Sequence, residues 1–411
     1  MVGAMRTFAE VCDELDRRRY VTLGLERIQR LLELLDHPER DLRMVQVVGT
    51  NGKGTTAVAL ASALQEAGTT TATYLSPHVL SYTERMMVGG AYVSEDQFAA
   101  VMNHVVEVAD ENNVPASQFE LLTAGALLLF SRAGVKWAIM EAGLGARYDA
   151  TTAAEPGAVV LTNVSLDHTE YLGDNLVDIA KEKLASLTGS GLLVLGDENP
   201  DIVEVARREC ARAGVRLVEV KSAQNCDPSR PTSPFTRQNV SLGVRAAEEL
   251  LGRSIATGGF EEVARQVEGT LPARFERYVV DEVPVIVDGG HNPGGLRAAL
   301  DAIRAIYGGR DLAVVFGVLR DKDIGSMLSA LKSEASYLVL ARPVSDRAAE
   351  PAEVADHFDP TDLNGRPAEV IVDVVEALSR AVGEMKRTDG VVLVTGSLYM
   401  GVDLLRGLRE S

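Results

Sequence analysis

The sequence is poor in cysteine, and this shortage limits how the protein is stabilised. Only three of its 411 residues are cysteines, Cys12, Cys210 and Cys226, and they lack the spacing of a metal site. An odd number of distant cysteines is typical of a reducing compartment rather than of a disulfide framework. We therefore expect free buried thiols and a cytoplasmic protein.

Positive charge and long apolar runs are also scarce. Lysine and arginine number 41 against 59 acidic residues, so the formal net charge is −18. General affinity for nucleic acid or for an anionic membrane needs an excess of basic residues on one face, and the composition argues against both. No run is long enough to cross a bilayer, and the first residues lack the apolar core of a signal peptide. We expect a soluble protein without nucleic-acid or membrane partners.

The length exceeds what one hydrophobic core usually serves, and it predicts two domains. Short apolar runs alternate with helical stretches, which is the pattern of α/β proteins with parallel sheets. We place the boundary near residue 275, so the expected domains are 1–275 and 276–411. The strands expected in the first domain are residues 44–48, 70–75, 136–141 and 158–162.

Two further stretches have a clear local pattern. The very apolar residues 119–134 predict a helix buried against the sheet. Residues 222–237, rich in proline and serine, predict an irregular loop, followed by helices from about Asn239 and Phe260.

The segment VVGTNGKGTTAVALASALQEAG, residues 47–68, predicts a phosphate-binding turn between a strand and a helix. Its glycines let the backbone approach an anion closely, and the amides of the new helix point at it. Lys53 supplies a positive charge, and the hydroxyl of Thr55 or Thr56 can reach a magnesium ion that bridges two phosphates. The usual P-loop pattern is not met, because Gly54 stands where a serine or threonine is required. A glycine turn that only connects strand to helix is the alternative, but it needs neither three glycines nor a lysine.

Polar residues follow other expected strands. Ser76, Glu141 and His168 leave three strand ends, at the edge where ligands of open α/β sheets collect. Their convergence favours a second metal site, while a polar cap or a structural histidine is the alternative interpretation. Lys181 and Lys183 follow on a helix, where lysines are usually solvated.

The second domain repeats this arrangement at two turns. VDGGHNPGGL places Asp288, His291 and Asn292 between a strand and a helix, and VTGSLYM places Ser397 and Tyr399 after another strand. Both turns lie at an expected sheet edge, so we expect the active site in the cleft between the domains.

Eight segments occur in order along the chain: GTNGKGTT, SPHVLSYTERMMVGG, FELLTAGALLLF, EAGLGARYDAT, LDHTEYLGDN, LPARFE, DGGHNP and GVLRDKDI. Together they resemble folylpolyglutamate synthase/dihydrofolate synthase, a branch of the Mur ligase superfamily. The resemblance implies a P-loop-containing N-terminal Mur-ligase-type ATPase domain plus a smaller Rossmann-like C-terminal domain. It also implies a ligase that transfers the γ-phosphoryl group of ATP to a substrate carboxylate, after which the amine of L-glutamate attacks the acyl phosphate. Phosphorylation is needed because a free carboxylate is a poor electrophile.

The resemblance assigns residues to ATP and to two magnesium ions. The ATP contacts that it implies are Asn51, Gly52, Lys53, Gly54, Thr55, Thr56, Asn239, Arg274 and Asp288. The metal ligands that it implies are Thr55, Ser76, Glu141, His168 and Lys183, the last one if it is carbamylated. The family segment EKAGI reads EKLAS here. The residues expected to carry catalysis are Lys53, His168, Lys183, Asp288 and His291.

The other substrates have sites implied by the same resemblance. The implied pterin-binding residues are Thr22, Leu23, Phe119, Glu120, Arg147, Tyr148, Asp149 and Ala150. The implied glutamate-binding residues are His291, Ser397 and Tyr399. The substrate would be dihydropteroate, a reduced folate or both, and we expect a monomer that binds only small molecules.

Two other functions stay open. The family pattern GLGGRLDATN reads GLGARYDATT, and an acidic residue of some members is Thr22 here. Ala146, Tyr148 and Thr22 favour a sister Mur-type ligase that joins a different carboxylic acid to an amino acid in specialised metabolism. A nucleotide-binding regulator without catalysis is the third possibility, but a sensor has no need of two metal sites.

Overall fold

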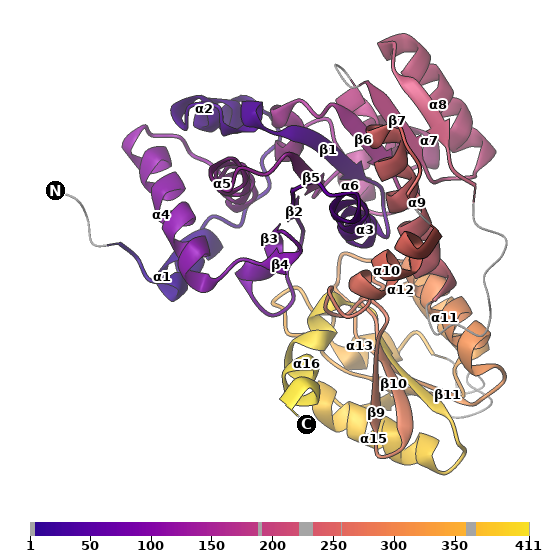
Figure 1. Ribbon diagram of the computed structural model, residues 1–411. Coiled ribbons are helices and arrows are strands. Elements are labelled where there is room, and N and C mark those ends of the chain that lie inside the picture. The colour runs from indigo at the N-terminus through magenta and orange to yellow at the C-terminus, as the bar shows by residue number, and fades with distance from the viewer. Residues whose placement is uncertain (1–4, 188–190, 222–232, 256, 359–366, 411) are drawn as a thin grey trace. The chain divides into compact units, whose positions relative to one another are not determined.

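The computed structural model describes residues 5–187, 191–221, 233–255, 257–358 and 367–410 (Figure 1). The chain divides into two compact units, and each is described by itself. The first comprises Met1–Gln224 and Gln238–Val267, and the second comprises Asn225–Arg237 and Glu268–Ser411. The domain boundary expected near residue 275 stays a prediction.

An eight-stranded sheet forms the centre of the first unit, in the order β4-β3-β2-β5-β1-β6-β7-β8. β3 is antiparallel to β2 and β4, and the other neighbours are parallel. The strands are β1 (Arg43–Val48), β2 (Thr71–Tyr74), β3 (Met86–Val88), β4 (Ala91–Tyr92), β5 (Trp137–Glu141), β6 (Ala158–Leu161), β7 (Leu192–Leu195) and β8 (Arg216–Glu219). The four strands expected in this part of the chain are confirmed as β1, β2, β5 and β6.

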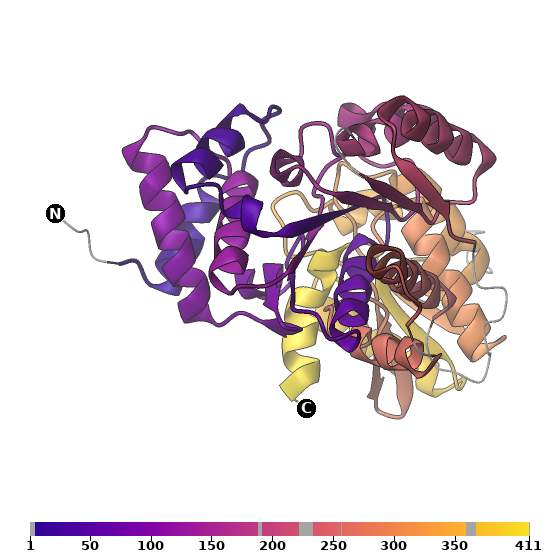
Figure 2. The same cartoon turned by 45° about the horizontal axis from the view of Figure 1, so that its top comes forward.

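Helices cover one face of this sheet. Their buried apolar residues form one core with β1, β2 and β5 and a second core with β6 and β7. The first core holds α1 (Phe8–Asp16), α2 (Glu26–Leu34), α4 (Glu95–Glu111) and α5 (Gln118–Arg132), and the second holds α7 (Leu176–Lys183) and α8 (Pro200–Ala213). In Figure 2 the helices of the first core form one indigo-to-purple group. The buried helix expected over 119–134 is confirmed as α5.

On the opposite face α3 (Lys53–Glu66) packs against β1, β2 and β5, and α9 (Pro234–Leu251) and α10 (Thr257–Val267) pack against α3. α9 lies very close to α3 at Gly243. A Cβ at this position would stand 2.7 Å from the backbone nitrogen of Leu60, so the close approach requires glycine. The expectation that the loop runs to residue 237 is wrong at its end, since α9 already begins at Pro234, whose fixed φ suits a first helical turn. Residues 222–232 of that expected loop lie outside the described residues.

The second unit is built on a six-stranded sheet in the order β13-β12-β11-β14-β10-β9. Only β9 is antiparallel to its neighbour. The strands are β9 (Glu276–Val280), β10 (Val283–Val287), β11 (Leu312–Phe316), β12 (Tyr337–Leu340), β13 (Glu369–Val370) and β14 (Val391–Thr395). The parallel strands β13, β12, β11, β14 and β10 form the sheet of an α/β domain with helices on both faces, in agreement with the expected Rossmann-like C-terminal domain.

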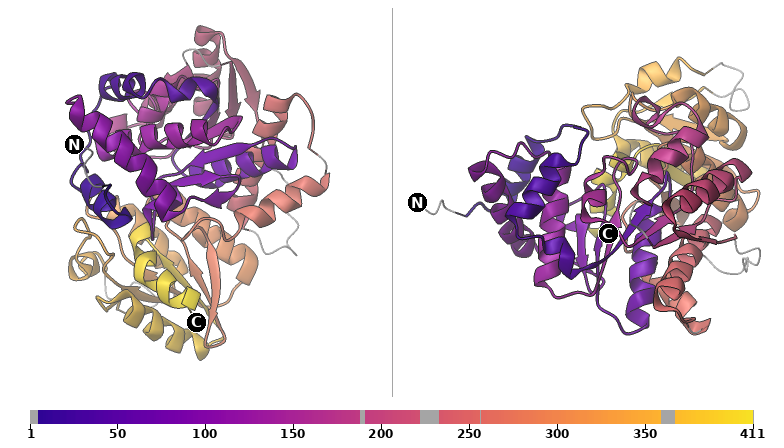
Figure 3. Two further views of the ribbon diagram at one scale, coloured as in Figure 1. Left: turned by 60° about the vertical axis from the view of Figure 1, so that its left-hand side comes forward. Right: turned by 90° about the horizontal axis from the view of Figure 1, so that it is seen from above.

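Helices cover this second sheet as well. α11 (Pro293–Tyr307) and α12 (Ile324–Glu334) share an apolar core with alternate residues of β11, and α15 (Val374–Lys386) contacts the same strands. Since alternate strand residues point to opposite faces, Ala313 and Val315, both fully buried, turn toward the α15 side. α13 (Pro351–Ala355) adjoins β12, and α16 (Gly401–Glu410) lies beside α15 (Figure 3).

The cysteines were expected to be free buried thiols. Cys210 is buried and Cys12 is half-buried, both as free thiols, and burial raises the pKa of each, to about 11 and about 12 respectively. Cys226 lies outside the described residues.

Within the described ranges, no helix combines the length and the apolar character needed to cross a membrane.

Candidate active site

The parallel strands of the first unit end at one edge of its sheet, and the expected site residues follow those ends. β1 leads into the glycine turn, β2 is followed by Ser76, and β5 ends at Glu141 itself. β6 leads to Asn163 and, further on, to His168. Ligands of open α/β sheets collect at this edge, so the first unit provides the expected setting for a nucleotide.

Two glycines of the turn have conformations that only glycine adopts readily. Gly49 has φ +145° and Gly52, the residue before α3, has φ +79°. A Cβ on Gly49 would meet the hydroxyl of Thr162 at 1.9 Å, and one on Gly52 would meet the side-chain amide of Asn239 at 2.4 Å. The turn therefore needs glycine both for its backbone angles and for close packing.

Hydrogen bonds from the β6 side fix the turn. The amide of Asn51 donates to Asn163 Oδ1 at 3.1 Å, and Asn163 Nδ2 donates back to the carbonyl of Asn51 at 2.8 Å. The Thr162 hydroxyl donates to the same carbonyl at 2.8 Å. These two residues were not among the expected site residues. Their position at the end of a strand, in TNVSLDH, is the signal that could have found them.

Two lysines converge on one carbonyl oxygen of the turn. Lys53 Nζ donates to the carbonyls of Gly49 and Thr50 at 3.2 and 3.1 Å. Lys183 Nζ, from the end of α7, donates to the same Gly49 carbonyl at 2.7 Å. A helix far along the chain thus brings a second cation to the glycine turn.

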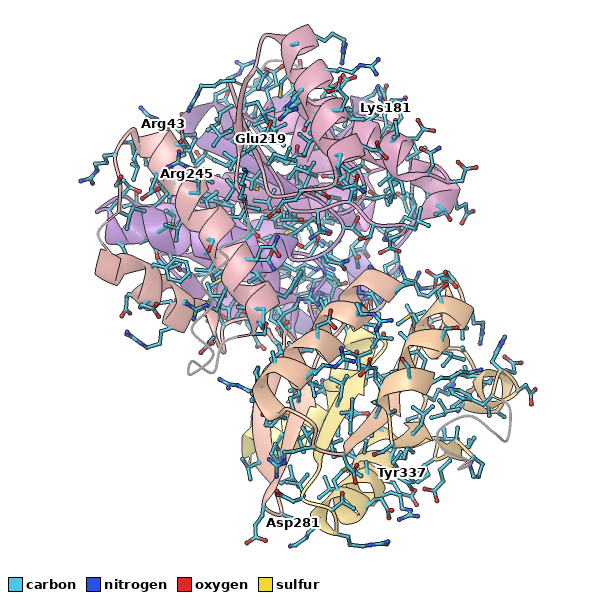
Figure 4. All side chains as sticks on the ribbon, turned by 90° about the vertical axis from the view of Figure 1, so that its right-hand side faces the viewer. Arg43, Lys181, Glu219, Arg245, Asp281 and Tyr337 are labelled. Atoms are coloured by element: carbon cyan, nitrogen blue, oxygen red, sulfur yellow. The ribbon has the colours of Figure 1, made fainter. Side chains whose placement is uncertain are left out.

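The burial of Lys183 changes its chemistry. Only 4% of the residue is exposed, and desolvation, reinforced by the charge of Lys53, lowers the pKa of its amine to about 7; Asp167 and Asp149 oppose this shift. Lys181, on the same helix, is 49% exposed, pairs with Asp178 and lies at the surface in Figure 4. The usual expectation of a solvated lysine is therefore confirmed for Lys181 and wrong for Lys183.

A buried amide lies beside the turn. Asn239 is 3% exposed, its Oδ1 accepts from the hydroxyl of Thr56 at 3.4 Å, and its Nδ2 is buried without a hydrogen-bond partner among the described residues. Thr55, 6% exposed, and Gly54 lie in the first turn of α3. A buried donor without a partner next to a glycine turn suits an acceptor atom of a ligand.

Ser76 and Glu141 lie together at the ends of β2 and β5. The amide of Ser76 donates to Glu141 Oε2 at 2.9 Å, and Glu141 is 4% exposed. The described residues contain no group of three or more His, Cys, Asp or Glu side chains that could hold a metal by itself. Mg²⁺ is usually bound by one or two carboxylates, with phosphate oxygens and water completing the shell. One carboxylate and nearby hydroxyls at a phosphate-binding turn therefore fit a magnesium ion that arrives with a nucleotide.

His168 has a different setting. It precedes the short helix α6 (Thr169–Leu172), with φ +50°, and its side chain is 41% exposed. Its ring Nε2 lies 4.0 Å from Asp167 Oδ2, whose side chain is 7% exposed. A role of this imidazole as a metal ligand stays a proposal.

The segments expected to bind a pterin are joined through Arg27. Its Nε lies 3.1 Å from Glu120 Oε1, and its Nη2 donates to the carbonyl of Thr22 at 3.1 Å and to that of Leu23 at 3.5 Å. Glu120 is buried and also accepts from the amide and the hydroxyl of Ser117, which caps α5. Arg27 was not among the expected residues. The proximity of Arg27 to the buried Glu120 could not be predicted from the sequence, because the two residues are far apart along the chain.

Phe119 lies against the end of β5. Its ring is 5.8 Å from that of Tyr74, and a Cβ on Gly143 would stand 2.8 Å from its Cζ. Gly143 thus leaves room for an aromatic ring two residues after Glu141. The apolar ring and the candidate metal carboxylate are therefore neighbours along the same sheet edge.

The segment from Arg147 to Ala150 combines exposed and buried residues. Tyr148 is 49% exposed and Arg147 pairs with Glu182 at 2.8 Å, whereas Ala150 is 3% exposed. Asp149 accepts hydrogen bonds from the amides of Gly143, Leu144 and Thr151 and from the Thr151 hydroxyl, and burial raises its pKa. Its carboxylate holds the turn after β5, and direct contact with a pterin stays a proposal.

The second unit places its expected residues on two adjacent turns. Asp288 follows β10 and accepts from the amides of Phe275 and Gly290 at 3.0 and 2.9 Å, and burial raises its pKa while Arg274 opposes the shift. His291 Nδ1 lies 3.0 Å from the carbonyl of Gly289. The charge of Arg274 therefore acts on the Asp288 carboxyl within the second unit.

The turn after β14 adjoins this one. The amide of Gly396 donates to the carbonyl of Gly290 at 3.1 Å, and Ser397, 3% exposed, accepts from the amide of Tyr399 at 3.2 Å at the start of η5 (Leu398–Met400). His291, Ser397 and Tyr399 therefore lie on neighbouring turns of one sheet edge. Glutamate binding by these residues stays a proposal.

Comparisons with known proteins agree with this geometry. Residues 47–227 match the Mur ligase middle domain, and residues 273–398 match the Mur ligase, glutamate ligase domain. The dihydrofolate synthase/folylpolyglutamate synthase of Bacillus subtilis is 30% identical over 416 residues, which cover 94% of this chain and 95% of the relative.

Solved structures extend the likeness to the fold. Escherichia coli FolC in complex with DHPP and ADP superimposes with a TM-score of 0.86 at 26% identity and 100% coverage of both chains. A bifunctional folylpolyglutamate synthase/dihydrofolate synthase with Mn, AMPPNP and L-glutamate bound gives 0.83 at 28% identity and 99% coverage.

The two sheets, the glycine turn and the two matching domains define a Mur-type ligase, an enzyme class that forms amide bonds with ATP. The chain belongs to the dihydrofolate synthase/folylpolyglutamate synthase family.

Proposed function

We propose that the protein uses ATP to join L-glutamate to a pterin-bearing carboxylic acid, either dihydropteroate or a reduced folate. The observation that carries this proposal is the convergence of Lys53 and Lys183 on the carbonyl of Gly49, with Ser76 and Glu141 at the next strand ends. A turn that merely connected a strand to a helix would not need to bury a second lysine against its backbone, since burying a charge is costly.

The turn would bind the phosphates of ATP. The amides at the start of α3 point at the site, and Lys53, already aimed at the turn, would stabilise the charge that develops as the γ-phosphoryl group moves to the substrate carboxylate. Asn239 would offer its buried Nδ2 to the nucleotide. These residues support the phosphoryl-transfer half of the reaction.

A divalent metal is part of the same proposal. Thr55, Ser76 and Glu141 would hold one ion, and His168, with Lys183 if it is carbamylated, a second. Bound metal would offset the charge of the phosphate oxygens during transfer. Neighbouring groups would orient two of the metal ligands. The Ser76 amide fixes the Glu141 carboxylate, and Asp167 lies beside the His168 ring.

The acceptor acid would lie beside Phe119 in the first unit. Its ring offers an apolar face, and Arg27 with Glu120 holds the segment of Thr22 and Leu23 in place. The glutamate would be bound by the turns of His291 and Ser397 in the second unit, where the resemblance also assigns Arg274 and Asp288 to ATP. We also propose that the protein acts as a cytoplasmic monomer with small-molecule partners only.

Substrate profiling tests this function. Purified protein is incubated with ATP, Mg²⁺, L-glutamate and either dihydropteroate or tetrahydrofolate, and both ADP release and product mass are followed. We expect ADP release that depends on the pterin acid, together with a product heavier by one glutamyl unit. If no pterin acid elicits ADP release while another carboxylic acid does, the protein is instead a sister ligase with a different acceptor.

A further inference from the structure

Gln46 is a polar residue in the interior of the first sheet. It lies in the middle of β1, is 0% exposed and stands between buried apolar residues of the strand. Burying an amide costs free energy unless its polar atoms are hydrogen-bonded. Gln46 Nε2 donates to the hydroxyls of Thr151 at 2.7 Å and of Thr152 at 2.8 Å. Both threonines lie on η3 (Ala150–Ala154), far along the chain from β1.

The direction of these hydrogen bonds follows from the next partners in the network. The Thr151 hydroxyl donates to Asp149 Oδ1 at 2.5 Å, and the Thr152 hydroxyl donates to the carbonyl of Ala146 at 2.7 Å. A hydroxyl has one proton to donate, so both threonine oxygens can only accept from Gln46. Its amide nitrogen must therefore face them. Gln46 Oε1 is left buried without a hydrogen-bond partner in the described part of the chain, which is a cost that this arrangement accepts.

The network ends on the turn that follows β5, residues 142–149. One end is the Asp149 carboxylate, which also accepts from the amides of Gly143 and Leu144 at 2.9 and 3.0 Å. The other end is the Ala146 carbonyl. One amide in β1 therefore holds both halves of this turn through its two threonine partners.

The same turn carries residues expected to bind the acceptor acid. Gly143 lies against the Phe119 ring, and Tyr148, which is 49% exposed, follows near the end of the turn. The strand before the turn ends at Glu141, the candidate metal ligand. Thr152 stands where the family pattern has asparagine, so its link in the network is a feature of this chain. The network thus lies at the part of the site where the sequence departs from its family.

We propose that Gln46 is a positioning residue for the acceptor acid. It is fully buried and acts through the two threonines, which hold the turn in the shape that receives the acid. The role rests on the proposed function, because it requires the acid to lie beside Phe119. The glycine turn is held separately, by Thr162, Asn163 and the two lysines, so loss of the network weakens binding of the acid and not that of ATP.

Steady-state kinetics of three variants test this role. Thr152→Val removes the hydroxyl at nearly constant volume, Thr152→Ser keeps it, and Gln46→Met removes the amide at similar length. We expect Thr152→Val and Gln46→Met to raise KM for the acceptor acid at least about fivefold, while kcat and KM for ATP change less than about twofold. Thr152→Ser should keep KM for the acid within about twofold of that of the unaltered protein. The Gln46→Met/Thr152→Val double variant should be no worse than Gln46→Met, because Thr152 acts in the same network.

Thr71→Val is the matched control. Thr71 is 1% exposed at the start of β2, and its hydroxyl is buried without a partner in the described part of the chain, so its loss changes neither KM. Urea unfolding followed by Trp137 fluorescence shows whether each variant is folded under assay conditions. If Gln46→Met is unfolded there, the two Thr152 variants decide the test.

Three results would overturn the proposal. A network that only stabilises the fold would lower the urea midpoint of Thr152→Val and leave KM for the acid unchanged. An equal rise in KM for ATP would mean that the network supports the whole site. A Thr152→Ser protein that behaves like Thr152→Val would show that the hydroxyl is not the group that matters.

Failure of this role is distinguishable from failure of the proposed function. The acid used is the one that the unaltered protein turns over in substrate profiling. If that acid bears no pterin, the proposed function is wrong, while the comparison of KM values still tests Gln46. If a pterin acid is turned over and KM for it is unchanged in the variants, only the role of Gln46 is wrong. If no acid is turned over, both are wrong.

Discussion

Lys183 gives the sharpest quantitative prediction, because its burial couples stability to pH. Its amine has a pKa of about 7 in the folded protein against 10.5 as its ordinary value. Below pH 7 the amine is protonated in both the folded and the unfolded states, so the full cost of burying the charge is present. Between these two values the unfolded state binds a proton that the folded state does not, so stability rises with pH.

The size of the rise follows from the two pKa values. A full unit of pH in this window contributes about 1.4 kcal/mol, and the slope is about half of that at pH 7 itself. Between pH 7 and pH 9, Lys183 should therefore stabilise the first unit by about 2 kcal/mol. The Lys183→Met variant has no titrating amine there and should lack this increment.

The assay uses urea unfolding at both pH values, in buffer freed of carbon dioxide so that the amine stays unmodified. Trp137 fluorescence reports on the first unit, since the chain has no other tryptophan. Lys181→Met is the matched control, because Lys181 lies on the same helix but is 49% exposed. It should keep the pH dependence of the unaltered protein.

The difference in the free energy of unfolding between the variant and the unaltered protein is compared at the two pH values. Titrating groups that both proteins share contribute equally to each and therefore cancel. The free energy of unfolding of Lys183→Met, minus that of the unaltered protein, should fall by about 2 kcal/mol from pH 7 to pH 9. If this difference is the same at both pH values, Lys183 is not a buried amine of lowered pKa, and the account of the turn is wrong.

Three other substitutions test the site. Lys53→Ala should lower kcat about 100-fold or more in an ADP-release assay while Lys181→Ala does not, because Lys53 acts on developing phosphoryl charge; a normal kcat would remove Lys53 from the site. Gly52→Ala should destabilise the first unit by about 1–3 kcal/mol in urea unfolding and weaken ATP binding by calorimetry, since its φ is +79° and its Cβ would meet Asn239; unchanged ATP affinity would contradict this packing. Phe119→Leu should raise KM for the pterin acid several-fold in steady-state kinetics but not KM for ATP; a change in KM for ATP alone would place the ring elsewhere.

The strands and the glycine turn were predictable because their signals are local. Each β-rich apolar run is followed at once by its polar residue, so Ser76 and Glu141 could be assigned to the same edge before the fold was known. Their contact at 2.9 Å confirms that proximity. The antiparallel strand β9 was not predicted; it follows the turn-like LPARFE segment directly, and none of its residues is fully buried.

The burial of Lys183 was harder to predict. Its neighbours Ile179 and Ala180 are buried, and a residue three or four positions further along a helix shares their face. That periodicity could have predicted a buried lysine, but the general preference of lysine for solvent outweighed it.

The central claim is that the substrate carboxylate is activated as an acyl phosphate, and an isotope measurement tests it most directly. The pterin acid is prepared with ¹⁸O in its carboxylate and incubated with the protein, ATP, Mg²⁺ and L-glutamate, and the released phosphate is analysed by mass spectrometry. Attack of the carboxylate on the γ-phosphorus and then of the amine on the carbonyl carbon leaves one carboxylate oxygen on phosphorus, so we predict one ¹⁸O per phosphate released. Amide product accompanied by unlabelled phosphate would contradict the account.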